Sequence, residues 1–520
     1  MTSGAAARSG RPPNPHRAWG RGVADLSQIA TAPPWAWVHS EHEARALAQE
    51  AVDLALGRGA TYADARLVEV VEERLYAASG REPDWRLEQV VGLGVRVLLK
   101  GAWGFGSRVL GSPSQGIEAA LAAVEMAEAQ VGPSSAHLDP LPAASGHFRT
   151  QFARDPFAVP ASTKHDLVAR LLEEALATQE VTRAVAGVNA KRQRRCFASS
   201  EGSWQVQELL ETGGLLQVWA ALNGEVQRRS YPNSFHGNTA AAGWEYLDEL
   251  GLPAELPRVA DEARALLRAP TMVAGTADLV LGPAMTALQI HESCGHALEL
   301  DRIFGDEAGF AGTSFIRAEE RGRMRYGSEA VTVVADPTTP GARGSFAFDD
   351  EGQPARPAVL IERGIVSDFL SSRETAQRIG RPTTAAMRAD GHGFMPLCFS
   401  THVGIQPGEG DLDALLERLG DGYYLDMDRS WSIDERRLNF QFGTEVAWEV
   451  RRGRRTRLCR NASYGGVTPE FWGSVEAVGG PETLQVFGLP CGKGEPKQWG
   501  FVSHGAAPIL VRGVRIGVAG

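Results

Sequence analysis

Two histidines five residues apart, at the end of an apolar segment, constrain the fold of this chain more than any other feature of its sequence. They belong to the hexapeptide His291-Glu292-Ser293-Cys294-Gly295-His296. Because each residue of an α-helix advances by about 100°, the two imidazoles would point roughly 140° apart on a regular helix. A one-residue π-bulge would bring both to one face, and Gly295 loosens the backbone at the required place. The spacing therefore predicts a helix with a local widening.

The residues before this motif predict that it lies in the interior of the molecule. Residues 279–281 read as a short buried strand, and Gly282-Pro283 turns the chain into an apolar helix over 284–290. Polar side chains after so apolar a run must be paired or bound to a ligand. An acidic residue directly after the first of two histidines is typical of zinc peptidases, in which it polarises a water molecule. The alternative is a set of hydrogen-bonded polar groups at the edge of a core.

Two histidines leave a zinc ion under-coordinated, because catalytic sites usually supply three protein ligands and keep one position for water. Glu299 and Asp301 follow closely enough to be ligands or carboxylates that orient the imidazoles. A distant candidate is Cys491, in the Gly-rich segment 488–494, where Lys493 would favour the thiolate. The alternative for Cys491 is an inert loop thiol.

These motifs resemble the TldD/PmbA family. Residues 291–301 resemble its HExxxHxLExD signature, and residues 490–493 resemble its late Cys-Gly-Lys segment. Further similarities lie at 62–66, at 92–97 with 104–106, and at 344–352, so that the resemblance covers about residues 42 to 520. The chain departs from the expected pattern at 391–398, where typical members have a more polar run.

The resemblance implies a zinc metallopeptidase with one Zn²⁺ per chain. Its ligands would be His291, His296 and Cys491, with Glu292 as general base. It also implies a dimer, either with a metal-less sister subunit of the TldE type or with a second copy. Since this chain retains the ligands, it resembles the catalytic, TldD-like subunit.

We expect hydrolysis of peptide bonds in short or unfolded polypeptides. The alternative is a non-catalytic partner or modulator protein whose metal is structural. Glu292 discriminates between the two, since a structural zinc site has no use for a base beside its ligand and is closed by a fourth one. Three residues are candidates for the group that stabilises the oxyanion, and the sequence does not choose among them: His392, His504 and Tyr464.

Composition favours a globular enzyme that does not bind nucleic acid. The chain has 520 residues, of which 43% are hydrophobic, and a net charge of −10, whereas nucleic-acid binding needs a basic field. No segment approaches the roughly 18 apolar residues that a membrane helix needs, so we expect no membrane partner. Five cysteines do not make a disulfide framework and fit a cytoplasmic protein.

The pattern of the chain predicts an α+β fold. We expect a disordered extension over 1–35, an α/β-sandwich-like domain over 36–270 with a further division near 132–160, and a mostly β domain over 271–520 that carries the metal helix. Ser40 and Glu43 predict a capping box for a helix over 41–56. Expected elements further along are helices near 113–130, 162–179 and 255–268 and strands at 64–76, 90–100 and within 183–230. The basic run 191–195 reads as a solvated strand face.

Overall fold

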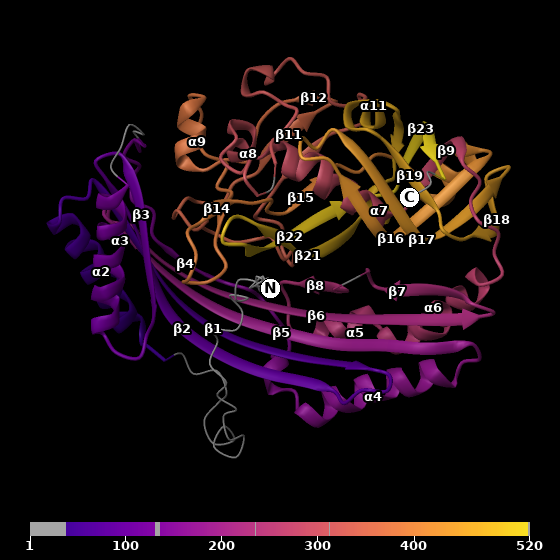
Figure 1. Ribbon diagram of the computed structural model, residues 1–520, viewed down its shortest axis with the longest axis horizontal. Coiled ribbons are helices and arrows are strands. Elements are labelled where there is room, and N and C mark those ends of the chain that lie inside the picture. Colours follow the sequence, from indigo (N-terminus) through magenta and orange to yellow (C-terminus); the bar gives the residue numbers. More distant parts are fainter. Residues whose placement is uncertain (1–37, 131–135, 235, 311, 518–520) are drawn as a thin grey trace, which may run out of the picture. The chain divides into compact units, whose positions relative to one another are not determined.

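The first part of the computed structural model is built on one large, mainly antiparallel sheet (Figure 1). The structure describes residues 38–130, 136–234, 236–310 and 312–517. The strands lie in the order β3-β2-β1-β5-β6-β4, and β7 and β8 also pair with β6. Their bounds are β1 (Tyr62–Ala78), β2 (Asp84–Leu99), β3 (Ala102–Val109), β4 (Gly146–Arg149), β5 (Val181–Ser199), β6 (Trp204–Leu222), β7 (Glu225–Tyr231) and β8 (Asn238–Ala240).

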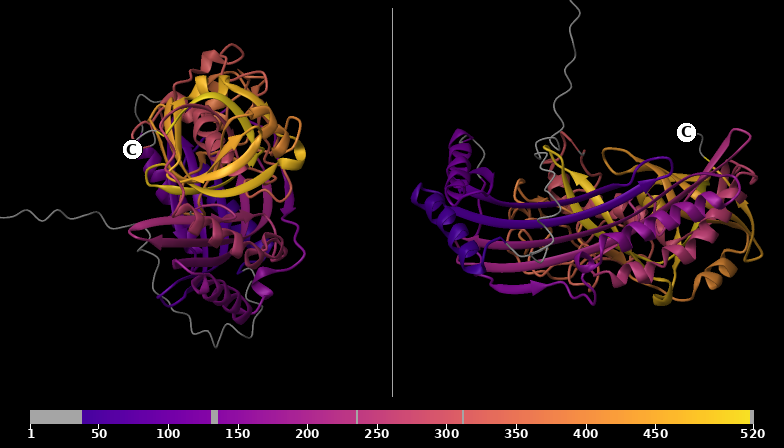
Figure 2. Two further views of the ribbon diagram at one scale, coloured as in Figure 1. Left: turned by 90° about the vertical axis from the view of Figure 1, so that its right-hand side faces the viewer. Right: turned by 90° about the horizontal axis from the view of Figure 1, so that it is seen from below.

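Helices cover one face of this sheet in two groups, which Figure 2 shows from below. The small side chains of α2 and α3 pack on one end of the strands, and α4, α5 and α6 pack on the other. The predicted capping box is present, because the Ser40 side chain accepts from Glu43 N while the Glu43 carboxylate accepts from Ser40 N. The helix bounds are α2 (Glu41–Gly57), α3 (Ser114–Ala129), α4 (Ala161–Ala177), α5 (Glu245–Leu250) and α6 (Leu252–Leu266).

The other face of the sheet is polar and lies against the C-terminal half of the chain. Alternate residues of a strand point to opposite faces of the sheet. Those on the polar face form hydrogen bonds and ion pairs with residues of the C-terminal half. The Arg66 guanidinium donates to the carbonyl of Phe394 at 2.6 Å, and Gln207 donates to the carbonyl of Phe348 at 2.8 Å. Arg96, which is buried, forms ion pairs with Asp64 at 2.7 Å and with Glu351 at 2.8 Å.

The basic run on β5 is buried, so the prediction of a solvated strand face is wrong. The strand lies between β1 and β6, with helices on one face and the C-terminal half on the other. Every residue from 191 to 195 is buried. Partners compensate the charges: Arg192 meets Asp155 at 2.8 Å, and Arg195 meets Asp350 at 3.1 Å. These acidic partners lie far from residues 191–195 in the sequence, so the local sequence does not predict the pairing.

The C-terminal half is mostly β. Its largest sheet runs β16-β9-β23-β19-β17-β18, and β16 also pairs with β17, which closes the strands on themselves. β12-β11-β10-β15, β13-β14 and β21-β22 form smaller sheets, and β20 joins β23. The strand bounds are β9 (Gly275–Leu281), β10 (Val333–Ala335), β11 (Ala358–Glu362), β12 (Ile365–Val366), β13 (Met387–Arg388), β14 (Leu397–Cys398), β15 (Val403–Ile405), β16 (Gly422–Ile433), β17 (Asn439–Arg451), β18 (Arg454–Cys459), β19 (Ser463–Val467), β20 (Val475–Val478), β21 (Gln485–Lys493), β22 (Gln498–Ala506) and β23 (Ile509–Ile516).

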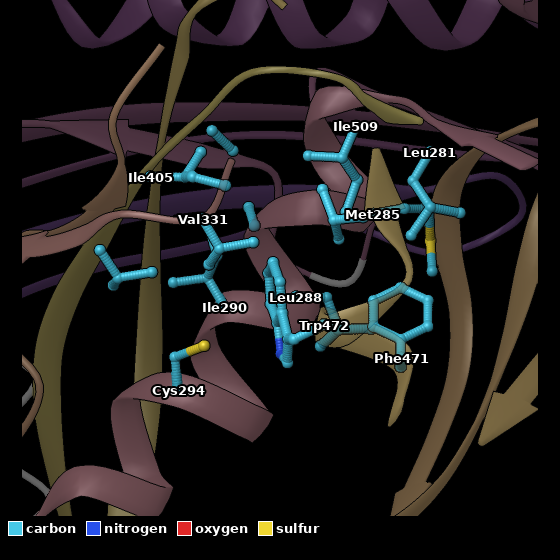
Figure 3. Close-up of a cluster of buried hydrophobic side chains, with 14 of the residues drawn as sticks. Leu281, Met285, Leu288, Ile290, Cys294, Val331, Ile405, Phe471, Trp472 and Ile509 are labelled. Atoms are coloured by element: carbon cyan, nitrogen blue, oxygen red, sulfur yellow. The ribbon is translucent and has the colours of Figure 1, made fainter. Parts of the chain in front are cut away.

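The closed strands surround α7 (Pro283–Ile290), all of whose residues are buried. In Figure 2, left, the yellow strands encircle this helix. Figure 3 shows Met285, Leu288 and Ile290 among side chains from β9, β15, β23 and the helix α11 (Thr468–Gly473). Further short helices are α8 (Leu300–Phe304), α9 (Arg373–Arg378) and α10 (Leu412–Leu419).

The predicted α+β class with a mostly β C-terminal region is confirmed. The predicted extension over 1–35 lies outside the described residues, and the domain boundaries stay predictions. Among the helices that the structure describes, none is long and apolar enough to cross a membrane.

Candidate metal centre

The motif helix widens where its spacing requires. After α7, residues His291–Gly295 form a π-helical turn, and a short 3-10 turn, His296–Leu298, follows. The amide of His296 donates to the carbonyl of His291, a hydrogen bond across five residues rather than four. As a result the imidazoles lie side by side, with ring centroids 4.6 Å apart. The predicted π-bulge is confirmed.

Side chains around the turn satisfy the polar groups that the widening releases. The Tyr326 hydroxyl donates to the carbonyl of Ser293, and Trp472 Nε1 donates to Ser293 Oγ at 2.8 Å. Ser293 Oγ in turn donates to the carbonyl of Gln289. All of these groups are buried, where an unpaired polar atom costs about 1–3 kcal/mol, so the contacts stabilise the π-turn against a regular helix.

Three potential metal donors meet at this turn. The donor atoms of His291, His296 and Cys491 all lie within 4.8 Å of one another, and all three side chains are buried. His296 Nε2 and Cys491 Sγ are 3.1 Å apart. Cys491 comes from β21, so a strand 195 residues away in sequence completes the set.

A relay of hydrogen bonds fixes the tautomer of His291. His504 Nδ1 lies 3.0 Å from the carbonyl of Val403, which can only accept, so Nδ1 must carry a proton. Burial lowers the pKa of His504 well below its usual value, so the ring is neutral and its Nε2 accepts. His291 Nδ1, at 2.8 Å from that nitrogen, therefore donates. This leaves the Nε2 lone pair of His291 free for a ligand.

A carboxylate orients the second imidazole. His296 Nδ1 lies 3.0 Å from Glu299 Oε1, so that His296 also presents its Nε2 lone pair. Burial acts to raise the pKa of Glu299, but the Lys493 ammonium, 2.9 Å away, holds it well below its usual range. Lys493 also bonds Asp301 at 2.7 Å and the carbonyl of Cys398 at 2.6 Å. Glu299 thus contacts a donor directly and Asp301 contacts Lys493, and neither carboxylate belongs to the donor cluster.

Lys493 favours the thiolate of Cys491 as expected, but burial and nearby carboxylates outweigh it in the metal-free chain. Burial, followed by the carboxylates of Glu299 and Glu292, raises the pKa of the Cys491 thiol more than Lys493 lowers it. A metal that binds here must therefore displace the thiol proton. Cys294, although inside the motif, points into the hydrophobic core beside Ile290 and Val331 (Figure 3).

Glu292 has a partner that the sequence did not reveal. Arg437 Nη1 donates to Glu292 Oε2 at 2.6 Å from the turn between β16 and β17. Nothing in the local sequence connects these residues, which are 145 positions apart. Of the three oxyanion candidates, only His504 lies at the site. Tyr464 donates to Gln289, and His392 packs against Gly92 of the first sheet.

The donor cluster lies in the part of the chain that matches a known protein family. Residues 274–518 match the family described as the PmbA/TldA metallopeptidase C-terminal domain. A metalloprotease of Methanothermobacter thermautotrophicus is 29% identical over 462 residues, which cover 88% of this chain and 95% of that protein. A zinc metalloprotease TldD homolog of Saccharolobus solfataricus is 25% identical over 48% of this chain and 54% of that protein.

Two solved structures have the same fold. A proposed modulator of a DNA gyrase from Thermotoga maritima matches with a TM-score of 0.72 at 16% identity, over 91% of this chain and 99% of that one. TldE from Thermococcus kodakarensis matches with a TM-score of 0.70 at 14% identity, over 90% of this chain and 99% of that one.

The buried histidines predict a loss of stability in mild acid. Burial lowers the pKa of His291, His296, His392 and His402 from 6.5 to about 4. Between these values the unfolded chain binds protons that the folded chain does not, so the free energy of unfolding falls as the pH falls. Each histidine contributes about 1.4 kcal/mol per pH unit in this window.

Thermal unfolding of the metal-free protein at several pH values measures this effect. The melting temperature should fall as the pH is lowered from about 6.5 to 5. A melting temperature that stays constant over this range would show that the imidazoles are not held neutral by burial.

Proposed function

Because this chain belongs to the TldD/PmbA family, we propose that it is a zinc-dependent metallopeptidase that hydrolyses peptide bonds in short or unfolded polypeptides. The observation that carries the proposal is the buried cluster of two imidazoles and one thiol beside Glu292. Relatives that bear the name metalloprotease support it.

The donor set fits zinc. His291 and His296 are neutral at pH 7 and each directs an Nε2 lone pair outward from its hydrogen-bonded Nδ1. Imidazole nitrogen and thiolate sulfur are the ligands that zinc prefers, and a set of three leaves a coordination position open. His291, His296 and Cys491 would hold one Zn²⁺ per chain.

Glu292 would carry the proton transfers. A bound zinc ion supplies Lewis acidity, which lowers the pKa of a water molecule and polarises a carbonyl group. Glu292 follows His291 directly and accepts the Arg437 hydrogen bond through Oε2, which leaves Oε1 able to take a proton from the attacking water. The same carboxyl group then gives this proton to the departing amine.

A non-catalytic role with a structural metal is less consistent with these contacts. Among the described residues, the donor cluster contains three members, whereas structural zinc sites are closed by four. A structural site also has no need of a carboxylate such as Glu292 beside its ligand.

The proposal is tested first at the base. Glu292→Gln keeps the size of the side chain but cannot accept a proton, so hydrolysis of unstructured peptides should fall at least about 100-fold. Zinc content should stay near one per chain, because Glu292 is not among the donors. Peptide cleavage with zinc-loaded protein, with and without chelator, checks this. Undiminished turnover in Glu292→Gln would remove the catalytic interpretation.

The third ligand is tested by cysteine substitutions. Cys491→Ser should lower zinc occupancy and abolish activity together, because a hydroxyl is a poorer zinc ligand than a thiolate. Cys294→Ala is the matched control inside the motif, and it should lose only packing in the core. Serine at each of the three remaining cysteines should leave the metal content unchanged. These cysteines are Cys196, Cys398 and Cys459. Metal content that follows any of these controls would refute the ligand assignment.

We further propose that the chain acts in the cytoplasm as a dimer, with a TldE-like sister subunit or with itself. Similarity of the fold to TldE over nearly the whole of that chain supports the sister subunit. Light scattering after size-exclusion chromatography, alone and with such a subunit, should give a dimer mass. A monomer in both experiments that cleaves folded proteins readily would contradict this.

A further inference from the structure

We propose that Arg437 is a positioning residue that holds the carboxylate of Glu292 in its working orientation. This inference rests on the proposed function of the site. The contact is short, at 2.6 Å between Arg437 Nη1 and Glu292 Oε2, and both side chains are largely buried, with 14% and 8% of their surfaces exposed. Charge-assisted hydrogen bonds of this kind are roughly twice as strong as neutral ones.

The backbone at Arg437 is held in a conformation that residues with side chains rarely adopt. Its φ is 62°, in the left-handed region. The amide of Arg437 donates to the carbonyl of Asp434 at 2.9 Å, and the Thr468 hydroxyl donates to the carbonyl of Arg437 at 2.8 Å. Such a conformation persists only when its surroundings fix it, and it is concentrated at functional sites.

Further hydrogen bonds fix the shape and the place of the turn that carries Arg437. The Asp434 carboxylate accepts from the amides of Leu438 at 2.8 Å and Asn439 at 3.0 Å, which shapes the turn. A second segment also bonds to this turn, because the amide of Thr313 donates to the carbonyl of Glu435 at 2.8 Å. The turn therefore presents the guanidinium from a rigid frame.

Neighbouring charges favour Glu292 over other acidic partners. Glu299 is engaged by His296, Arg302 and Lys493. Of the two carboxylate oxygens of Glu292, Oε2 accepts from Arg437 Nη1, and Oε1 serves the proton transfer. A hydrogen bond to one oxygen stops rotation of the carboxylate, and proton transfer depends on a base held within hydrogen-bond reach.

Kinetics of Arg437 variants test the positioning role. Arg437→Gln should lower kcat about 10- to 100-fold, the effect of removing a partner that orients a site residue. KM should change less than about twofold, because Arg437 contacts the base and not the substrate, and zinc content should not change. Arg437→Lys should restore part of the lost kcat, since an ammonium can still donate to Oε2.

Arg436→Gln is the matched control. It removes the same charge from the same turn, but its side chain is exposed, so its kcat should equal that of the native protein. An unchanged kcat in Arg437→Gln, a rise in KM alone, or loss of zinc would overturn the proposal.

A second measurement needs no activity and separates this inference from the proposed function. Melting temperatures of metal-free Glu292→Gln, Arg437→Gln and the double variant form a cycle that reports the interaction between the two side chains. We expect the shifts of the single variants to be non-additive in the double variant. Additive shifts in melting temperature would show that the two side chains do not interact, and would overturn the proposal. If the native protein shows no zinc-dependent hydrolysis, the proposed function is refuted. The double-mutant cycle would still report whether Glu292 and Arg437 interact.

Discussion

The widened helical turn at the end of α7 is the constraint on which the site depends. A hydrogen bond from His296 to His291, across five residues, inserts one extra residue and rotates the second imidazole onto the face of the first. This turn is enclosed on all sides, so each released polar group needs a partner. Ser293, Tyr326 and Trp472 supply those partners. The geometry of the donors is thus a consequence of packing around one residue.

Buried charges connect the helix to the strands that complete the site. Lys493 lies on β21, two residues after Cys491, and its ammonium is fully buried between the carboxylates of Glu299 and Asp301. This arrangement fixes the strand against the segment that follows His296. On the other side, the relay from Val403 through His504 fixes the ring of His291. Both connections orient donors, and neither requires a ligand to be present.

Local sequence patterns predicted those structural features that depend only on residues close together in the chain. The capping box at Ser40, the apolar strand and helix before the motif, and the π-bulge between His291 and His296 each follow from residues within a few positions of one another. The Gly-rich surroundings of Cys491 made it a candidate, but only the likeness to a known family assigned it as a ligand. The basic run on β5 was misjudged, because its charges are matched by Asp155, Glu69 and Asp350 from other segments.

The sequence by itself determined that His291 and His296 need a widened helix, because the angle between side chains follows directly from their spacing. It also determined that the chain has α and β regions, since apolar periodicity is a local property. Only the tertiary structure decided that Arg437 meets Glu292, that His504 orients His291, and that the Cys491 thiol is protonated in the metal-free chain. These features depend on distance and burial between segments far apart in the chain, which residue order does not specify.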